Sequence, residues 1–209
     1  MQKSSTLISN FINSSEKVFL LGPIKDNTEM IDDFFFTHSK CPLIYIDGGL
    51  VNYSRAGLSI GDGDSASQEC DVIFNQDKSF TDLEGALSLL PKGIKELHCA
   101  GFIGGRLDHQ LVVFQNFMSF SHQRNCYIKH HGNNQIEVLP AGEHEVLINS
   151  NFSVLSAQKQ VISITGECDY QVENVEISPF SGRGLSNIGH GLIRITCSSS
   201  ICLFNLPTI

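Results

Sequence analysis

The residues Pro42-Leu43-Ile44-Tyr45-Ile46-Asp47-Gly48-Gly49 decide the fold of the first half of the chain. A short apolar run leads directly into an acid and two glycines, which is the pattern of a buried strand that ends in a tight turn. In an open α/β sheet, ligands bind where the carboxyl ends of the strands meet. The sequence therefore predicts that the Asp47 carboxylate emerges at a binding edge, with Gly48 and Gly49 beside it.

The same alternation continues on both sides of this stretch. Strand-like runs at residues 18–21, 43–46, 72–74, 96–100 and 126–129 are separated by helix-like stretches. Two helices are well marked, at residues 81–90 and 107–120, because apolar residues recur in them at three- and four-residue spacing. The stripe of the second helix consists of Leu107, Leu111, Phe114 and Met118. This alternation predicts an α/β domain with a mostly parallel sheet flanked by helices.

The sequence pattern changes from alternating strand-like and helix-like segments to strand-like segments alone after residue 133. Strand-like segments follow at residues 152–155, 160–165, 170–177, 192–197 and 201–206, with frequent turn residues and no helical period. We therefore expect two domains: an α/β domain over residues 1–133, followed by an all-β sandwich or barrel over residues 134–209.

Composition limits the functions that fit this chain. The formal charge is -8, the isoelectric point is near 5.4, and the 14 Lys and Arg residues are scattered. A nucleic-acid or anionic-membrane surface needs clustered basic residues and is not expected. No apolar stretch has the length of a signal peptide or membrane span, so we expect a cytoplasmic protein. The 7 cysteines are dispersed and odd in number, which argues against a disulfide framework or a zinc site.

Further acids follow other apolar runs. Gly61-Asp62-Gly63-Asp64-Ser65 places two acids at i and i+2, on one side of an extended chain, where they can share one cation. Taken alone, this run also fits a simple turn. Asp82 opens the first predicted helix, where acids are favoured by the helix dipole whatever the function. Acids gathered on one edge repel each other unless a cation joins them, and Mg²⁺ that arrives with phosphates suits oxygen ligands. The pattern points to phosphoryl or pyrophosphoryl transfer.

A glycine-rich turn opens the second predicted helix. In Gly104-Gly105-Arg106-Leu107-Asp108-His109, we expect main-chain N–H groups to form an anion site, and Arg106 adds a donor suited to phosphate oxygens. Taken alone, the turn also fits a tight connection between a strand and a helix. The spacing matches neither the dinucleotide fingerprint nor the Walker motif. His109 fits a helix cap as well as a ligand contact.

Four other residues have competing interpretations. Lys78 fits either a solvated surface charge or a phosphate contact. Glu84 completes a capping box with Thr81, which favours a structural role. His130 and His131 point to opposite faces of a strand, so we interpret them as structural or surface residues rather than a metal pair.

Taken together, Asp47-Gly48-Gly49, the G-D-x-D-S run, Thr81-Asp82 and the G-G-R-x-D-H turn resemble thiamin pyrophosphokinase (thiamine diphosphokinase). The resemblance extends to the Ser153-Val154-Leu155 strand and to Ser186-Asn187, and so covers most of the chain. It implies a kinase-type transferase that moves the pyrophosphoryl group of ATP to the hydroxyl of thiamin, giving thiamin diphosphate and AMP. It also implies Mg²⁺ and a homodimer with active sites at the subunit interface.

The resemblance assigns roles residue by residue. The implied Mg²⁺ ligands are Asp47, Asp62, Asp64 and Asp82. The implied catalytic residues are Asp62, Asp64, Asp82, Arg106 and Asp108, with Asp108 or Asp64 able to take the proton of the acceptor hydroxyl. The implied nucleotide contacts are Asp47, Gly48, Gly49, Lys78, Thr81, Gly104, Gly105 and His109. The implied thiamin contacts are Tyr170, Ser186 and Asn187.

Two departures from the family pattern bear on these roles. The family's D-x-T-D reads Ser79-Phe80-Thr81-Asp82, so one acid is missing, although Asp77 lies two residues earlier. The family's G-L-K-Y-like segment reads Glu167-Cys168-Asp169-Tyr170, in which Tyr170 fits stacking on a cationic heterocycle or a plain core position. Two alternatives therefore stay open: a pyrophosphokinase with a different acceptor, and a non-catalytic sensor of thiamin or its diphosphate.

Overall fold

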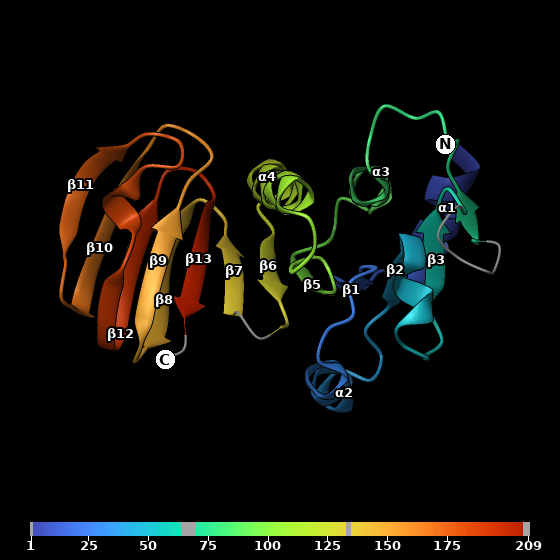
Figure 1. Cartoon of the computed structure of the whole chain (residues 1–209), viewed down its shortest axis with the longest axis horizontal. Coiled ribbons are helices and arrows are strands. Elements are labelled where there is room, and N and C mark those ends of the chain that lie inside the picture. The colour runs from blue at the N-terminus through green and yellow to red at the C-terminus, as the bar shows by residue number, and fades with distance from the viewer. Residues whose placement is uncertain (1, 64–69, 133–134, 207–209) are drawn as a thin grey trace. The chain divides into compact units, whose positions relative to one another are not determined.

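The computed structural model describes residues 2–63, 70–132 and 135–206. The chain divides into two compact units, residues 1–116 with 130–133 and residues 117–129 with 134–209. The division passes through helix α4 (Leu107–Arg124) and strand β6 (Tyr127–His130). The structure confirms the predicted combination of helices with many strands (Figure 1). The domain boundary at residues 133 and 134 stays a prediction.

In the described part of the first unit, a parallel sheet has the strand order β5-β1-β2-β3-β4. The strands are β1 (Lys17–Leu21), β2 (Leu43–Ile46), β3 (Leu58–Gly61), β4 (Val72–Ile73) and β5 (Glu96–Ala100). The helices are α1 (Gln2–Ile12), α2 (Thr28–Thr37), α3 (Asp82–Leu89) and the first half of α4, with the 3₁₀ turn η1 (Asp47–Val51) after β2. Strands buried on both faces read as continuous apolar runs, which is why β2 is fully buried along its length.

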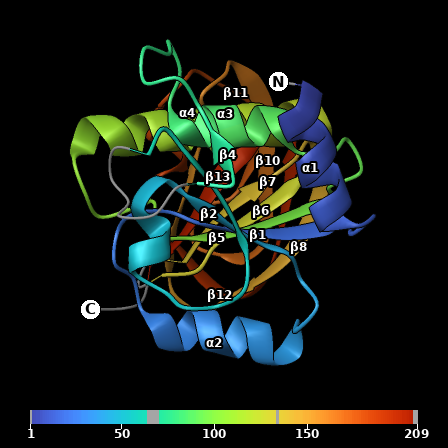
Figure 2. The same ribbon diagram turned by 90° about the vertical axis from the view of Figure 1, so that its right-hand side faces the viewer.

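Helices cover both faces of this sheet. In Figure 2, α2 lies on one face, whereas α1 and α3 lie on the other. α2 begins at Asn27, whose side chain accepts a hydrogen bond from the Glu29 N–H, and it buries Phe34 and Phe35 against Phe19 of β1. Each aromatic side chain buried in this way contributes roughly 2–3 kcal/mol of hydrophobic free energy. The core of the first unit therefore holds β1 and β2 rigid just before their carboxyl ends.

The strand register sets the geometry of the sheet edge. Ile46 of β2 pairs with Ile60 of β3, so the chain leaves both strands at nearly the same level. Leu21 of β1 is paired with Tyr45 on one side and with Ala100 of β5 on the other. The segments that follow β1, β2, β3 and β5 therefore emerge along one edge, as expected for an open parallel sheet.

The second unit is built from antiparallel pairs. Its strands are β7 (Gln135–Leu139), β8 (Gly142–Ile148), β9 (Asn151–Leu155), β10 (Gln160–Cys168), β11 (Val172–Ile177), β12 (Asn187–Cys197) and β13 (Ile201–Leu206), with the 3₁₀ turn η2 (Gly182–Gly184). Strand β12 pairs with β9 at its start and with β8 and β10 over the rest of its length. Its residues alternate strictly between buried and exposed, and the buried set joins one apolar core with β9, β10 and β13. These strands provide the predicted all-β part of the chain.

Several elements were not predicted, namely α1, α2, β3, β7 and β8. The predicted apolar stripe of α4 is wrong in its first half, because Leu107 is 72% exposed and Leu111 is 50% exposed. All 7 cysteines are free, and five of them are buried. Among the described residues, no helix combines the length and the apolar character needed to cross a membrane.

Candidate active site

Three carboxylates meet at the carboxyl edge of the parallel sheet. Asp47 is the first residue after β2, Asp62 follows β3, and Asp82 is the first residue of α3. One oxygen from each lies within 4.8 Å of the others. The predicted ligand Asp64 and its neighbour Ser65 lie outside the described residues. The structure therefore brings together each of the predicted metal ligands that it describes.

The turn that presents Asp47 needs a glycine at position 49. Asp47 has a φ of 53°, in the left-handed region that non-glycine residues rarely adopt. Gly48 and Gly49 are buried, and a Cβ on Gly49 would lie 2.3 Å from the main-chain oxygen of Leu21. A side chain at Gly49 would therefore push η1 away from β1 and move the Asp47 carboxylate. The nucleotide contacts implied for Gly48 and Gly49 stay a prediction.

A lysine lies inside the acid cluster. Lys78 Nζ is 2.6 Å from Asp62 Oδ2 and 3.3 Å from Asp82 Oδ1, and its side chain is only 9% exposed. Burial lowers the pKa of Lys78, but the hydrogen bond to Asp62 and the attraction of Asp82 outweigh burial and raise the pKa overall. Burial is also the main cause of the raised pKa of Asp82, reinforced by repulsion from Asp62 and Asp47 and opposed by Lys78. Lys78 is thus a buried ion-pair partner rather than a solvated surface charge.

The acid cluster fits a divalent cation. Three carboxylates and one ammonium leave two negative charges in the cluster, as counted on the described residues. Asp82 Oδ1 is buried and has no properly oriented hydrogen-bond donor among them, although Lys78 Nζ lies close by. A buried acceptor without a donor costs free energy unless a ligand fills its coordination. Hard oxygen ligands that retain net negative charge suit Mg²⁺, so the residues present fit that ion.

The glycine-rich turn after β5 contains two glycines with left-handed backbone conformations, and its role as an anion site stays a prediction. Gly101 and Gly104 have φ values of 75° and 114°, which only glycine adopts freely, and the turn leads directly into α4. Arg106 Nε donates to Asp108 Oδ1 at 3.1 Å, and a second guanidinium nitrogen donates to Asp108 Oδ2. This pair raises the pKa of Arg106 and lowers the pKa of Asp108. Both side chains are exposed, so an incoming anion can reach Arg106 directly.

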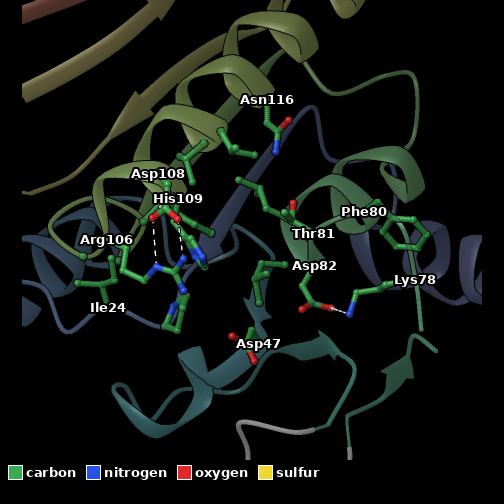
Figure 3. Close-up of a pocket in the computed structure, with 18 residues that line it drawn as sticks. Ile24, Asp47, Lys78, Phe80, Thr81, Asp82, Arg106, Asp108, His109 and Asn116 are labelled. Atoms are coloured by element: carbon green, nitrogen blue, oxygen red, sulfur yellow. Dashed lines mark hydrogen bonds and ion pairs between the residues drawn. The ribbon is translucent and has the colours of Figure 1, made fainter. Parts of the chain in front are cut away.

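A pocket of about 520 Å³ joins these two groups. Figure 3 shows Arg106, Asp108 and His109 on one side of it, Lys78 and Asp82 on the other, and Asp47 on the wall between them. The remaining lining residues are Pro23, Ile24, Ile46, Phe80, Thr81, Leu83, Gly101, Phe102, Gly105, Val112, Val113 and Asn116. The pocket therefore combines acidic side chains, an exposed guanidinium group and an apolar wall. That combination suits a small molecule that carries phosphates and a ring.

The structure also separates structural acids from site acids. The predicted capping box is confirmed, because Thr81 Oγ1 accepts from the Glu84 N–H and the Glu84 carboxylate accepts from the Thr81 N–H. Asp77 is exposed, its N–H is bonded to Asn75, and it does not belong to the acid cluster. Asp77 therefore does not replace the acid that is missing at Ser79.

The predicted thiamin contacts lie in the second unit. Asn187 is 5% exposed, and its amide is bonded to both the N–H and the carbonyl oxygen of Tyr170, at 3.0 and 2.7 Å. Tyr170 is 67% exposed, so its alternative interpretation as a core aromatic is wrong. Ser186 is exposed and has a φ of 59°. Asn187 thus fixes the main chain that carries an exposed Tyr170, and direct contact of these residues with thiamin stays a prediction.

The histidine pair has the structural role expected from its strand position. His131 packs on Phe19 at a ring distance of 5.6 Å and shares a hydrogen bond with His98. His130 is 5% exposed and lies 3.9 Å from Asp26, where burial lowers its pKa to about 4. Neither histidine belongs to a cluster of metal-binding groups among the described residues.

Among the polar side chains that line the pocket, sequence reasoning missed Asn116. It lies on α4 at i+8 from Asp108, with Val112 at i+4, so the helical period places all three on one face. The four-residue spacing of these positions was the available signal. Residue type alone does not show that an asparagine in the middle of a helix is buried or lines a pocket.

The comparisons with known proteins agree on the fold. No protein-family model matches the chain, and no curated protein matches its sequence. Solved structures do match. The thiamine pyrophosphokinase from Bacillus subtilis aligns with a TM-score of 0.69 at 20% identity, covering 92% of this chain and 100% of that one. The thiamin pyrophosphokinase from Candida albicans aligns with a TM-score of 0.71 at 14% identity, covering 94% of this chain and 90% of that one. The yeast thiamin pyrophosphokinase gives 0.70 at 15% identity, with 90% and 85% covered. The chain therefore has the fold of the thiamin pyrophosphokinases.

Proposed function

We propose that the protein is a thiamin pyrophosphokinase, which transfers the pyrophosphoryl group of ATP to the hydroxyl of thiamin and releases AMP. The observation that carries the proposal is the convergence of Asp47, Asp62 and Asp82 within 4.8 Å of one another, beside a pocket that Asp47, Asp82 and Arg106 line. The shared fold supports the same activity.

Asp47, Asp62 and Asp82 would hold Mg²⁺, with Asp64 as a further ligand. When bound there, Mg²⁺ would neutralise charge on the triphosphate and fix its orientation. Lys78 and Arg106 supply positive charge from two sides of the pocket, where charge develops on the transferred group. Transfers of this type depend on in-line positioning and charge neutralisation more than on a covalent intermediate.

Asp108 is the candidate for the proton of the acceptor hydroxyl. While Arg106 is bound to it, the lowered pKa makes Asp108 a weak base. When Arg106 binds a phosphate instead, that stabilisation of the carboxylate is lost and its basicity rises. This transfer of Arg106 from Asp108 to a phosphate would couple nucleotide binding to deprotonation of the acceptor hydroxyl.

Two further parts of the proposal concern the oligomeric state and the cellular location of the protein. We propose a homodimer in which the active site lies at the subunit interface, and a cytoplasmic location where Mg-ATP is plentiful. Gel filtration with light scattering on the purified chain measures the first part directly.

The main test is AMP formation from Mg-ATP with and without thiamin. Asp62→Asn is expected to lower the rate at least 100-fold, because it removes a charged ligand where phosphate charge must be neutralised. Asp77→Asn is the matched control, since Asp77 is an exposed acid outside the cluster, and its rate should stay within about twofold of the wild type. Near wild-type turnover in Asp62→Asn would remove the metal assignment.

A non-catalytic sensor is the second candidate, and one observation favours it. Lys78 already gives the acids a cation, and the family's additional acid is replaced by Ser79. A sensor predicts a thermal shift with thiamin or its diphosphate but no AMP. If AMP forms only with another hydroxymethyl heterocycle, the alternative acceptor applies.

A further inference from the structure

The pocket contains one buried polar group that the proposed chemistry does not use. Asn116 lies on the same face of α4 as Asp108 and Val112, two turns beyond the Arg106–Asp108 pair. An α-helix rises 1.5 Å per residue, so Asn116 stands about 12 Å along the helix from Asp108. It therefore lines a part of the pocket well separated from the carboxylate of Asp108.

The Nδ2 atom of Asn116 has no hydrogen-bond partner in the part of the chain that the structure describes. The residue is 9% exposed, and Nδ2 is buried without a hydrogen-bond acceptor among the described residues. Figure 3 shows its side chain pointing from α4 into the pocket. Buried amide groups are almost always hydrogen-bonded in folded proteins, and an exception calls for a functional explanation. A ligand that presents an acceptor to this amide provides one.

The walls of the pocket suit a flat ring. Phe80 and Val112 both line it, and each is 41% exposed, so apolar surface is open to the cavity. Leu83 and Val113 add further apolar lining. Ligand sites of this kind bind rings by apolar contact and select among them with a few polar groups. In this pocket, the charged residues are occupied by phosphate and metal chemistry under the proposed function, which leaves Asn116 for the ring.

We propose that Asn116 selects a nitrogen heterocycle by its amino-bearing edge. The amide oxygen accepts from an exocyclic amino group, and Nδ2 donates to the adjacent ring nitrogen, as in the bidentate pairing of asparagine with adenine. Adenine presents this edge, and so does the aminopyrimidine of thiamin. This inference rests on the proposed function for the identity of its ligands. If an oxo group replaces the amino group, the oxo oxygen and the amide oxygen of Asn116 are both acceptors and face each other in this pairing. Asn116 therefore disfavours the oxo form of the ring.

The test compares matched amino and oxo substrates in wild type and Asn116→Leu. ATP is compared with ITP at saturating thiamin, and thiamin with oxythiamin at saturating Mg-ATP, as ratios of kcat/KM. We expect one of the two preferences to fall by about 5- to 100-fold in the variant, the range for one bidentate amide pairing. The pair whose ratio falls identifies the ring bound at Asn116. Unchanged ratios in both pairs would overturn the proposal.

Two further variants control for folding. Gln123→Leu makes the same chemical change at an exposed residue of α4 and should leave both ratios unchanged. Asn116→Asp keeps the side-chain volume, removes the donor, and should also lower the preference. If wild type forms no AMP with any acceptor, the proposed function fails by itself. Calorimetric binding of AMP against IMP and of thiamin against oxythiamin to the same variants then tests Asn116 independently, and equal losses for amino and oxo ligands would contradict its role.

Discussion

Replacing Lys78 with methionine is expected to destabilise the protein strongly in the absence of divalent cations and weakly in their presence. Lys78 and Asp62 are 9% and 12% exposed and 2.6 Å apart, so solvent screens their pair little. Breaking a buried pair leaves an uncompensated charge and costs about 3–5 kcal/mol. In this cluster the loss also removes the cation that separates three carboxylates. For a chain of this size, a loss of about 3 kcal/mol corresponds to a fall in Tm of roughly 6–12 °C.

Magnesium should reverse most of this loss. At a concentration of about 100 Kd, a ligand that binds only the folded state stabilises it by about 2.7 kcal/mol. Lys78→Met should also bind Mg²⁺ more tightly than wild type, because no ammonium competes for Asp62. The assay is thermal unfolding in EDTA and across a Mg²⁺ titration.

The matched control for this experiment is Lys159→Met. Lys159 pairs with Glu176 at 2.9 Å, but both side chains are more than 60% exposed. Such a surface pair is worth about 0–1 kcal/mol and should show no Mg²⁺ response. The reasoning is refuted if Lys78→Met loses less than about 1 kcal/mol in EDTA, or if its Mg²⁺ response does not exceed that of the control.

Three other outcomes follow from the same geometry. Asp82→Asn removes a carboxylate whose pKa is raised by burial and by neighbouring acids, so the free energy of unfolding in EDTA should change by no more than about 1 kcal/mol. The increase in Tm that Mg²⁺ induces should become smaller in this variant. A larger loss of stability in EDTA would show that the contact with Lys78 dominates. Burial lowers the pKa of His98 and of His130 from 6.5 to about 4, so the unfolded chain binds protons at these residues before the folded chain does as the pH falls. Between about pH 6.5 and 4, protonation of each residue in the unfolded state therefore lowers the free energy of unfolding by up to roughly 3 kcal/mol. Urea unfolding of His130→Phe from pH 7 to 4 should show a flatter decline, and an unchanged slope would reject this assignment. Asn187→Ala should lower the free energy of unfolding by about 2–3 kcal/mol, because the N–H and carbonyl oxygen of Tyr170 lose their hydrogen-bond partner. Ser186→Ala, at an exposed side chain, should change it by no more than about 0.5 kcal/mol in the same urea titration.

The strands that the sequence predicts well are those buried on both faces. The runs predicted at residues 18–21, 43–46 and 96–100 correspond to β1, β2 and β5 within one residue. Strand β3 was missed because Ser59 interrupts its apolar pattern. Ser59 is nevertheless 3% exposed, since its hydroxyl and N–H are both bonded to the Asp71 carboxylate at 2.8 Å. A partner twelve residues away satisfies the polar group, and composition does not reveal such a pairing.

Helix patterns were less reliable because burial on a helix depends on what it faces. The apolar stripe predicted for α4 assumed that Leu107 and Leu111 reach a core, yet both are exposed. The face that lines the pocket instead carries Asp108, Val112 and Asn116. Helix α1 was missed because it is rich in Ser and Asn, although Ile8 and Ile12 at i and i+4 are buried. In both helices, tertiary contacts decide which stripe matters.

The acids of the candidate site could be predicted because each follows a strand or opens a helix, but the role of Lys78 could not. Its position depends on Asp62, sixteen residues earlier in the chain, and on the start of α3. That position also changes how the substitution at Ser79 should be judged. Ser79 and Asp77 are both exposed, whereas Asp47, Asp62 and Asp82 converge without either of them. Together with Lys78, these three acids carry a net charge of −2, as counted on the described residues, and a single divalent cation balances that charge. The three acids therefore converge on one another without an acid at position 79, so the missing acid is compatible with a working cation site.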